Sequence, residues 1–350
     1  MIQLIYSWYN KNKRNLPWRT TTDPYKIWLS EVILQQTRVE QGISYYYKFI
    51  NSFPDVFSLA NAGEEEVLKL WMGLGYYSRA RNLHKSAKII AEKHEGFFPR
   101  TYNEILSLKG VGSYTAAAIA SIAFDQHYPV LDGNVYRFLS RYFGISTGID
   151  TTAGKKEFNK IAFDIMPVGN TGFHNQALME FGALQCVPVS PDCHNCPLCD
   201  SCYAFTFKKV KELPVKVKKT KKRERYFYYF LVEDNNHIWL EKRSGNDIWK
   251  NLFQYPLHET DKGLDEQDII NLLPSDMTGI KYNLKSVSSV EKHILTHQTI
   301  FARLIHIELL STAHTNHNYL KVKSEELHNY AVPRLIEKLS QKNDFLKFTY

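Results

Sequence analysis

The stretch "LSLKGVGSYTAAAIASIAF", from Leu106 to Phe124, joins two predicted helices through the turn Gly110-Val111-Gly112. Glycine permits positive φ and close backbone approach, and the second helix begins with N–H groups that have no partner within the helix. Such an N-terminus suits a phosphate, because its backbone donors and its dipole both favour negative charge. An ordinary turn is the alternative. The stretch therefore predicts a tight helical hairpin that could hold a phosphate.

Helical patterns surround this hairpin on both sides. Apolar residues recur at helical spacing through residues 1–206, in segments separated by Gly, Pro, Asn and Asp. The predicted helices span Tyr25–Val39, Glu64–Trp71, Tyr77–Lys93, Tyr102–Leu108, Tyr114–Phe124, Asn134–Phe143 and Lys155–Met166. We predict an all-helical domain over residues 1–206.

The sequence changes character after residue 225. "RYFYYFLVED", "HIWLEKR" and "TIFARLIHIELL" are rich in the aromatic and β-branched residues that strands favour. "DEQDIINLL" and "AVPRLIEKLSQK" have helical patterns. A chain of 350 residues is also long for a single core. We therefore predict a second, α+β domain over residues 226–350.

A basic segment separates the two predicted domains. Residues 208–225 carry eight Lys and two Arg against two Glu, which accounts for the whole formal net charge of +8. Clustered cations suit a polyanion, because each one near a phosphate releases condensed counterions. A solvated linker kept extended by self-repulsion has the same composition. Residues 207–225 are predicted to form a basic interdomain connector, and contact with nucleic acid is one of these two interpretations.

The N-terminus and the apolar runs bear on the compartment. "MIQLIYSWYN" does not have the order of charged, apolar and small residues that a signal peptide shows. No apolar run approaches the roughly 18 residues of a membrane helix. We expect an intracellular protein without membrane contact, in which clustered cysteines bind metal more often than they form disulfides.

All five cysteines lie in "CVPVSPDCHNCPLCDSC", from Cys186 to Cys202. Two ligand sets fit the spacing. Cys193, Cys196, Cys199 and Cys202 recur every third residue, as in a four-cysteine zinc site or a ferredoxin run. Cys186, Cys193, Cys196 and Cys202 leave one wide and two narrower gaps, which suit the spread corners of a 4Fe–4S cluster better than one tetrahedral ion. We favour the cluster with Cys199 as a spare, and zinc is the alternative.

Glu31 has a context that suits a proton donor. In "PYKIWLSEVILQQTRVE" it shares a predicted helix face with Ile27 and Leu34. Apolar neighbours desolvate a carboxyl and raise its pKa, so that it keeps a proton near neutral pH. The alternative is a surface Glu at the margin of an amphipathic helix.

Asp132 has a context that suits an ionised carboxylate. It precedes a Gly-Asn turn in "HYPVLDGNVYRFLSR", and a helix opens near Val135. An ionised carboxylate stabilises the positive sugar that forms when a glycosidic bond breaks. The alternative is an N-cap or turn residue without chemistry. Together Glu31 and Asp132 are candidates for a protonated acid and an ionised carboxylate, the pair of roles used to break glycosidic bonds.

These segments together resemble one family. The hairpin, "SEVILQQTRVE", "LDGNV" and the C-x6-C-x2-C-x5-C loop are similar to those of the MutY-type adenine DNA glycosylases, within the endonuclease III or helix–hairpin–helix superfamily. The resemblance covers nearly the whole chain. It implies an all-α helix–hairpin–helix domain, with the hairpin over about residues 104–124 and a structural 4Fe–4S cluster in the 186–202 loop. It also implies that the ligands are Cys186, Cys193, Cys196 and Cys202.

The resemblance assigns catalytic roles residue by residue. Glu31 would protonate N7 of adenine, Asp132 would stabilise or transiently bond the sugar cation, and Asn134 would support Asp132. Tyr114 stands where strand-cleaving relatives carry a lysine. A phenol cannot form their Schiff base, so the family implies a monofunctional enzyme that leaves an abasic site.

DNA contacts follow from the same resemblance. Gly110 and Gly112 would hold the backbone, and Gln36 would enter the base stack. In "GLGYYSRARNLHK", Tyr77 matches the intercalating aromatic and Arg79 could hold a phosphate, whereas we interpret Tyr76 as a packing residue. One departure is that "VPVSPD", between the first two cysteines, has no basic residue where relatives carry them.

The C-terminal domain resembles the MutT-like (Nudix-fold) domain of the same family. "IWKNLFQYP" matches its W-x-x-L-[FY]-x-[FY]-P segment, and the Nudix metal motif is absent, which predicts binding rather than hydrolysis. Its "HILTH" segment matches the family's H-x-F-S-H loop, so Leu295, Thr296 and His297, with His293, would recognise 8-oxoguanine. Leu in place of Phe removes a stacking face, and Thr in place of Ser keeps the hydroxyl.

The expected partner is double-stranded DNA with adenine opposite 8-oxoguanine or guanine, bound by a monomer. Three other functions compete with this one. A bifunctional glycosylase–lyase for oxidised pyrimidines would need the lysine that Tyr114 replaces. A non-catalytic iron–sulfur protein would not depend on Glu31 and Asp132. A Nudix hydrolase would need the missing metal motif.

Overall fold

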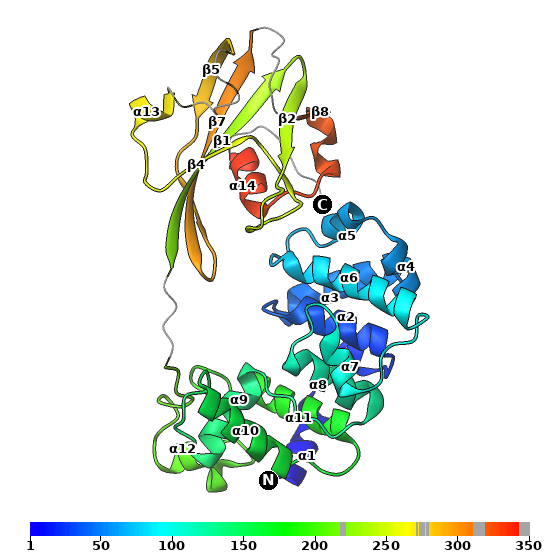
Figure 1. Cartoon of the computed structure of the whole chain (residues 1–350). Helices are drawn as coiled ribbons and strands as arrows, with labels where there is room; N and C mark the ends of the chain where they lie inside the picture. Colours follow the sequence, from blue (N-terminus) through cyan, green and yellow to red (C-terminus); the bar gives the residue numbers. More distant parts are fainter. Residues whose placement is uncertain (218–221, 271, 273–276, 278–279, 311–318, 343–350) are drawn as a thin grey trace. The chain divides into compact units, whose positions relative to one another are not determined.

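The computed structural model of the chain describes residues 1–217, 222–270, 272, 277, 280–310 and 319–342. It consists of two compact units (Figure 1). The first unit contains Met1–Asn61 and Asn82–Lys219, and the second contains Ala62–Arg81 and Thr220–Tyr350. Both the sequence division and this one place a boundary in the connector. The structure adds a second feature, because residues 62–81 group with the C-terminal unit.

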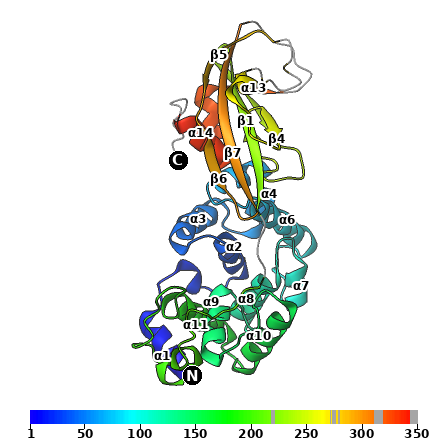
Figure 2. The ribbon, with the colours of Figure 1, turned by 90° about the vertical axis from the view of Figure 1, so that its left-hand side faces the viewer.

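The first unit is helical, as the periodicity predicts (Figure 2). Its helices are α1 (Ile2–Asn12), α2 (Pro24–Leu34), α3 (Val39–Ser52), α4 (Val56–Asn61), α7 (Tyr102–Ser107), α8 (Ser113–Phe124), α9 (Gly133–Phe143), α10 (Thr152–Asp164), α11 (Thr171–Leu184) and α12 (Tyr203–Thr206). Helix α6 (Ser78–Lys93) crosses from the second unit into the first, since the boundary follows Arg81.

Helix α8 is the centre of the first unit. It contacts α2, α7 and α11, and its residues from Thr115 to Ser121 are buried. Small residues make this close contact possible: a Cβ on Gly172 of α11 would lie 2.7 Å from Cα of Ile122. The alanines noted in the sequence therefore serve the packing of the hairpin's second helix.

Helix α2 ends earlier than the periodicity predicts. The predicted helix continues to Val39, whereas α2 ends at Leu34 and α3 begins at Val39. Gln36 lies in the break with a φ of 58°, a left-handed conformation that costs a non-glycine residue about 1 kcal/mol. No Gly or Pro marks the break, so the local sequence gives no stop signal.

The second unit contains a mixed β-sheet. Its main path runs β3-β2-β1-β7-β5, with β4 also paired to β1, β6 to β7 and β8 to β2. The strands are β1 (Arg223–Asp234), β2 (His237–Lys242), β3 (Phe253–Gln254), β4 (Leu257–Thr260), β5 (Tyr282–Val287), β6 (Glu291–Ile294), β7 (Gln298–Leu309) and β8 (Leu320–Lys323). Strands β1 and β7 run parallel, and β1 pairs antiparallel with β2 and β4.

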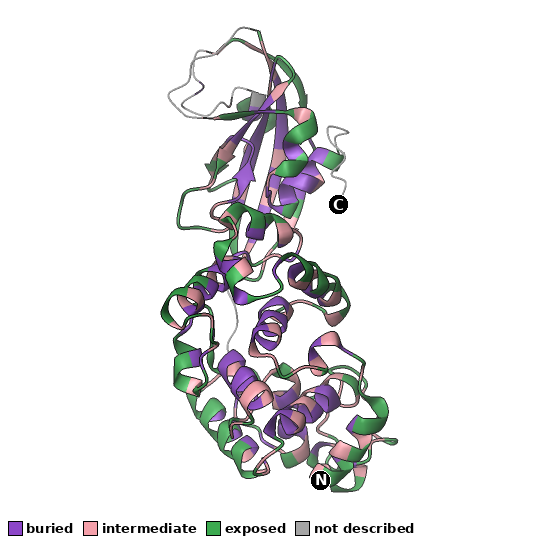
Figure 3. Cartoon of the chain, turned by 90° about the vertical axis from the view of Figure 1, so that its right-hand side faces the viewer, coloured by how far each residue is buried: buried purple, intermediate pink, exposed green. Residues whose placement is uncertain are grey.

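Both faces of this sheet are covered. On one face Phe227, Tyr229 and Leu231 of β1 join a core with α14 (Arg334–Lys342). On the other face Tyr228 and Phe230 join a core with α13 (Glu266–Ile270). The central strands are therefore buried along most of their length (Figure 3). This explains why β1 reads as a continuous apolar run rather than an alternating one.

The remaining elements of the second unit are short. They are α5 (Glu64–Leu70) and a 3-10 helix at Ser324–Asn329. The three strands and two helices expected after residue 225 correspond to β1, β2, β7, α13 and α14. Within the described residues, no helix is both long and apolar enough to cross a bilayer.

Candidate active site

Glu31 lies inside the helical unit on α2. Its side chain is 7% exposed, and Ile27 and Leu34 line the same pocket. Burial raises the pKa of Glu31 to about 7, a hydrogen bond with Tyr114 lowers it in part, and the charge of Asp132 raises it further. The sequence prediction of a desolvated carboxyl is therefore matched by the geometry, and Glu31 can hold a proton at neutral pH.

Tyr114 stands beside Glu31 at the start of α8. Burial raises the pKa of its phenol well above the usual value, and the charges of Glu31 and Asp132 raise it further. The hydroxyl can donate to the sulfur of Met179 over 3.7 Å. Tyr114 therefore stays a neutral phenol whose hydroxyl can donate to the carboxylate of Glu31, which limits the rise in the pKa of Glu31.

Asp132 is the N-cap of α9, as the alternative interpretation held, and it also faces the pocket. Its Oδ1 accepts from Val135 N at 2.7 Å, and its Oδ2 accepts from Asn134 Nδ2 at 2.7 Å. Burial raises the pKa of Asp132, and these donors and the charge of Arg137 oppose the rise. Donors aimed at both oxygens favour the carboxylate form, which is the form that a sugar cation needs nearby.

Glu180 on α11 is a third acid of the same pocket, and sequence reasoning missed it. Burial would raise the pKa of Glu180, but hydrogen bonds from Arg19 and Arg14 outweigh it and lower the pKa to about 2. The Nη2 atoms of Arg14 and Arg19 lie 2.6 and 2.7 Å from Glu180 Oε2. An acid inside "ALMEFGAL" is the signal that could have revealed it, because the same signal identified Glu31.

One pocket of about 210 Å³ brings these groups together. Glu31, Tyr114, Asp132, Asn134 and Glu180 all line it. This volume is below the 300–1,000 Å³ of sites for drug-sized ligands, and it suits a group as small as one nucleobase. Burial raises the pKa values of Glu31 and Asp132, whereas the two arginines lower that of Glu180, so one pocket holds acids whose pKa values differ.

Arg137 links this pocket to the first cysteine. Its Nη2 donates to Asn134 Oδ1 at 2.9 Å, and its Nε donates to the carbonyl of Cys186 at 2.7 Å. Helices α9 and α11 are also in close contact here, since a Cβ on Gly182 would lie 2.6 Å from the carbonyl oxygen of Asn134. Asn134 is thus held by Arg137 through its side chain and by the close packing of Gly182 against its backbone. These contacts keep its amide nitrogen in place to donate to Asp132.

The helical hairpin has the geometry that its glycines predict. Gly110 has a φ of 79°, and a Cβ there would lie 2.6 Å from Cβ of Asn82. Gly112 is the N-cap of α8, and no side chain caps that end of the helix. Gly110 and Gly112 are both exposed. The amides of this turn can therefore reach an external anion.

The turn before α6 corrects two expectations. Tyr77 is 4% exposed, and its hydroxyl donates to the carbonyl of Val332 at 3.4 Å, whereas Tyr76 is 44% exposed. The guanidinium of Arg79 is buried and donates to the carbonyls of Leu74 and Gly75 at 3.4 and 3.2 Å. Tyr76 is thus the accessible aromatic, and Arg79 stabilises the turn instead of presenting its charge to a phosphate.

Leu295, Thr296 and His297 form the tip between β6 and β7. Thr296 and His297 are exposed, and Leu295 and His293 are partly so. A pocket of about 510 Å³ within the second unit is lined by these residues and by Trp249. The segment is therefore accessible to a ligand.

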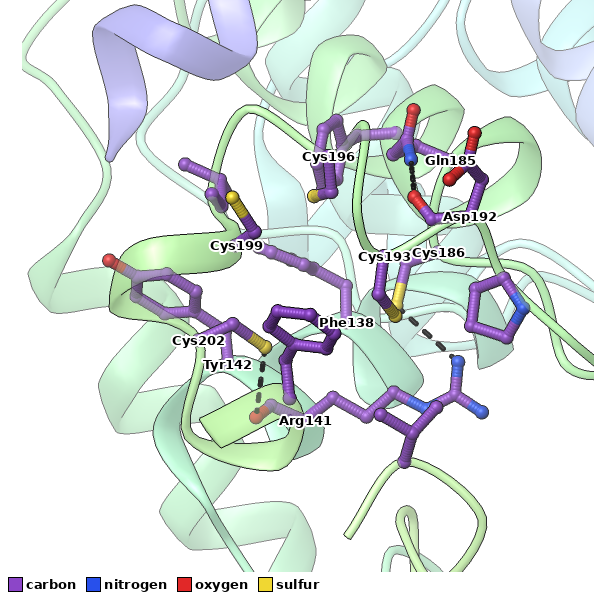
Figure 4. Close-up of a pocket in the computed structure, with 15 residues that line it drawn as sticks. Phe138, Arg141, Tyr142, Gln185, Cys186, Asp192, Cys193, Cys196, Cys199 and Cys202 are labelled. Atoms are coloured by element: carbon purple, nitrogen blue, oxygen red, sulfur yellow. Dashed lines mark hydrogen bonds between the residues drawn. The ribbon is translucent and has the colours of Figure 1, made fainter. Parts of the chain in front are cut away.

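The cysteines surround a pocket next to α9, with Phe138 and Arg141 among its walls (Figure 4). Burial raises the pKa of both Cys193 and Cys196, and negative charge on Cys186 and Cys202 raises it further, so these four sulfurs are neighbours. Cys199 instead bonds Asp200, with its Sγ 3.4 Å from Oδ1. The grouping favours Cys186, Cys193, Cys196 and Cys202 as one ligand set.

The chemistry of the four thiols fits an anionic iron–sulfur cluster. The buried Arg141 lies beside them, with its Nη1 3.5 Å from Cys186 Sγ, which suits a negatively charged group at this position. Cysteine thiolates are the usual ligands of a 4Fe–4S cluster, and zinc, the alternative, takes the same ligands.

Comparison with protein families identifies both units. Residues 29–162 match the HhH-GPD superfamily base excision DNA repair protein family, and residues 228–342 match the NUDIX domain family. The helical glycosylase fold and the Nudix-fold C-terminal domain that the sequence predicts are thereby confirmed.

Similar proteins agree with the families. Adenine DNA glycosylase of Buchnera aphidicola from Acyrthosiphon pisum is 42% identical over 73% of this chain and 73% of that protein. The enzyme of Buchnera aphidicola from Baizongia pistaciae is 38% identical over 87% of this chain and 85% of that protein. Adenine DNA glycosylase of Homo sapiens is 42% identical over 57% of this chain and 38% of that longer protein.

Solved structures show the same fold. A thermostable thymine-DNA glycosylase is 30% identical, with a TM-score of 0.55 over 59% of this chain and 95% of that chain. A trapped endonuclease III–DNA covalent intermediate is 22% identical, with a TM-score of 0.52 over 59% of this chain and 94% of that chain, and supports the fold alone. From the site, the two family matches and these relatives, we conclude that the chain belongs to the adenine DNA glycosylases, base-excision-repair enzymes that act on N-glycosyl bonds.

Proposed function

We propose that this protein hydrolyses the N-glycosidic bond of adenine mispaired with 8-oxoguanine or guanine in double-stranded DNA and leaves an abasic site. One observation carries the proposal. Glu31, with a pKa of about 7, and Asp132, with donors on both oxygens, line one pocket of nucleobase size.

The chemistry follows from the protonation states. Adenine has to leave its stack to reach the pocket, at a cost of a few kcal/mol. Glu31 then donates a proton to N7, so that the base departs as a neutral group. Asp132 stabilises the positive charge that develops on the sugar, and water adds to the sugar to complete the hydrolysis.

Glu180 orders one wall of the pocket together with two arginines. Its oxygens accept hydrogen bonds from Arg14 and Arg19, and the residue is 1% exposed. These three side chains therefore hold one another in place, which fixes that wall of the pocket around the base.

Tyr114 makes the enzyme monofunctional. A phenol held neutral in the pocket cannot form a Schiff base with the sugar. We expect the DNA strand to stay intact after adenine excision until base or heat is added, and borohydride should trap no covalent complex. Gel analysis before and after alkali measures this, and nicking without alkali would contradict it.

Contacts with DNA are assigned to the hairpin and to Gln36. Gly110 and the uncapped start of α8 hold a backbone phosphate. Gln36 is exposed in a strained turn next to the pocket-lining residues Leu34 and Thr37, where it can enter the stack as adenine leaves. The exposed ring of Tyr76 supplies the aromatic contact of the second unit in place of Tyr77.

The 4Fe–4S cluster would be held by Cys186, Cys193, Cys196 and Cys202, whose grouping fits it. When bound, it supplies four thiolate bonds that fix the loop and takes no chemical part in base removal. Arg137 donates hydrogen bonds both to the carbonyl of Cys186 and to Asn134. The position of the loop therefore affects the position of Asn134.

The tip between β6 and β7 is assigned to recognition of 8-oxoguanine. Thr296 presents a hydroxyl there, which is hydrogen-bonded to the Tyr76 hydroxyl in the free protein and would turn to the lesion when DNA binds. Replacing Thr296 with Ala then removes one hydrogen bond to the lesion of about 0.5–1.5 kcal/mol. We expect the ratio of excision opposite 8-oxoguanine to excision opposite guanine to fall about two- to tenfold. Thr296→Ser is the matched control, because it keeps the hydroxyl and should keep the ratio.

One assay tests the whole proposal. The protein is incubated with duplexes that carry adenine opposite 8-oxoguanine, guanine or thymine, and abasic sites are measured by alkaline cleavage. We expect the fastest reaction opposite 8-oxoguanine and none opposite thymine. Equal rates on all three duplexes, or no abasic sites, would refute the proposal.

A further inference from the structure

Arg141 on α9 joins two segments that lie far apart in the sequence. The residue is 4% exposed, and its guanidinium bonds both segments. Nη1 donates to the carbonyl of Val187 at 2.8 Å and Nη2 to that of Pro188 at 3.0 Å, directly after the first cysteine. Nε donates to the carbonyl of Leu213, in the connector, at 3.1 Å. One side chain thus holds the cysteine loop and the connector together.

The connector continues along the helical unit beyond Leu213. Ile149 N donates to the carbonyl of Val215 at 3.0 Å, and Val217 N donates to Asp150 Oδ1 at 3.0 Å. Val217 also lies over Gly148, where a Cβ would come within 2.6 Å of its Cγ2. Of the two interpretations of the connector over residues 207–225, the solvated, self-repelling linker does not hold for 213–217, because hydrogen bonds dock this part on the helical unit.

We propose that Arg141 is a positioning residue that couples the cluster loop to the docking of the connector on the helical unit. The carbonyls of Val187 and Pro188 follow directly from ligand Cys186, so ligand bonds fix them in place. If the cysteines lose their bonds to the cluster, the carbonyls of Val187 and Pro188 are no longer held in place as acceptors for Arg141. The Arg141 side chain then becomes more mobile, and its hydrogen bond to the carbonyl of Leu213 is weakened. Lysine cannot replace Arg141, because its single ammonium group cannot reach acceptors on two segments at once, whereas the planar guanidinium group can.

This coupling rests on the proposed cluster but not on adenine excision, so proteolysis measures it independently of activity. Trypsin can cut after Lys216, which lies between the docked residues Val215 and Val217. Cleavage requires local opening, and its rate therefore reports how firmly the segment is docked. Iron content and visible absorption of the purified protein establish first whether the cluster is present, and its absence would overturn the proposed cofactor separately.

The test is a cycle of four proteins: wild type and Arg141→Lys, each with the cluster and after its removal. We expect Lys216 cleavage in the wild type to accelerate at least about fivefold when the cluster is removed, the lower end of typical coupling between sites. In Arg141→Lys the cleavage after Lys216 should be fast even with the cluster present, and removal of the cluster should increase its rate only slightly. Equal acceleration in both proteins, or none in the wild type, would overturn the proposal.

Two controls separate coupling from general unfolding. Asp150→Ala removes the acceptor of Val217 N without touching the cysteine loop, so it should expose Lys216 whether or not the cluster is present. Cleavage after Lys155 and Lys156 in α10 should stay slow in every protein. If α10 is cut as fast as the connector, cluster removal has unfolded the unit, and the link through Arg141 is rejected.

Discussion

Replacing Glu31 with Gln is expected to reduce adenine excision by about 10²- to 10⁴-fold, the range that a positioned general acid contributes. Gln fills the same space between Ile27 and Leu34 and keeps hydrogen-bonding capacity toward Tyr114, but it has no proton to give. Binding to the mispaired duplex should stay within about threefold. Single-turnover rates and gel-shift titrations measure the two quantities separately, and a variant that keeps a tenth of the wild-type rate would exclude Glu31 as the acid.

The pH dependence gives an independent check of the same residue. Burial raises the pKa of Glu31 from 4.5 to about 7, so the protonated form is lost as the pH rises through 7. The wild-type single-turnover rate should fall about tenfold for each pH unit above that value. In Glu31→Gln this limb should be absent, because Gln does not titrate.

Glu31→Gln should raise the stability of the protein at high pH although it lowers the activity. A carboxyl whose pKa is raised in the folded state stabilises the protein below about pH 4.5, and this contribution is lost as the pH rises through about 7. Above pH 7 the buried charge of Glu31 therefore costs about 3 kcal/mol. Glu31→Gln escapes this cost and should raise Tm at pH 8, so that loss of activity cannot be attributed to unfolding.

Replacing Asp132 with Asn is expected to have the second largest effect, a loss of about 10²- to 10³-fold, as for other electrostatic stabilisers of a transition state. Asn is as good an N-cap as Asp, so it can keep the hydrogen bond from Val135 N and the start of α9. It loses the negative charge opposite the sugar and also one acceptor, because its amide nitrogen cannot accept from Asn134 Nδ2. The change isolates chemistry from the capping role that the same residue fills.

Asn134→Ala is the comparison for Asp132→Asn. It leaves the carboxylate in place and removes one of its two donors, Asn134 Nδ2. The expected loss is smaller, because a single hydrogen bond to a charged group contributes about 1.5–3 kcal/mol. A larger loss in Asn134→Ala than in Asp132→Asn would mean that charge on Asp132 is not what stabilises the transition state.

Residues with a strong local context could be predicted from the sequence. The apolar neighbours of Glu31, among them Ile27 and Leu34, predict a desolvated acid but also allow a surface residue, and the resemblance of "SEVILQQTRVE" to the family's catalytic helix decides between the two. Gly110 stands out because its φ of 79° and the 2.6 Å approach of Asn82 leave little room for another residue. The central strands β1 and β7 were recognisable because burial on both faces makes a continuous apolar run.

Features that depend on tertiary contacts could not be predicted. Arg14 and Arg19 look like ordinary surface cations until α11 brings Glu180 against them. The burial of Arg79 and Tyr77 depends on contacts within the second unit, for example with Val332, which is distant in sequence. Backbone groups of residues 213–217 make the hydrogen bonds that dock this segment. The side-chain composition of a segment does not predict such bonds.

The backbone at Gln36 has a consequence for engineering this enzyme. Glycine adopts its φ of 58° without strain, so Gln36→Gly removes a local cost of about 1 kcal/mol from the folded state. Selection for heat resistance alone would thus favour variants without the side chain that we assign to the base stack. A library ranked by melting temperature would enrich variants that lack the Gln36 side chain and that bind mispairs without moving adenine out of the base stack. Directed evolution of the enzyme should therefore be scored on repair in living cells.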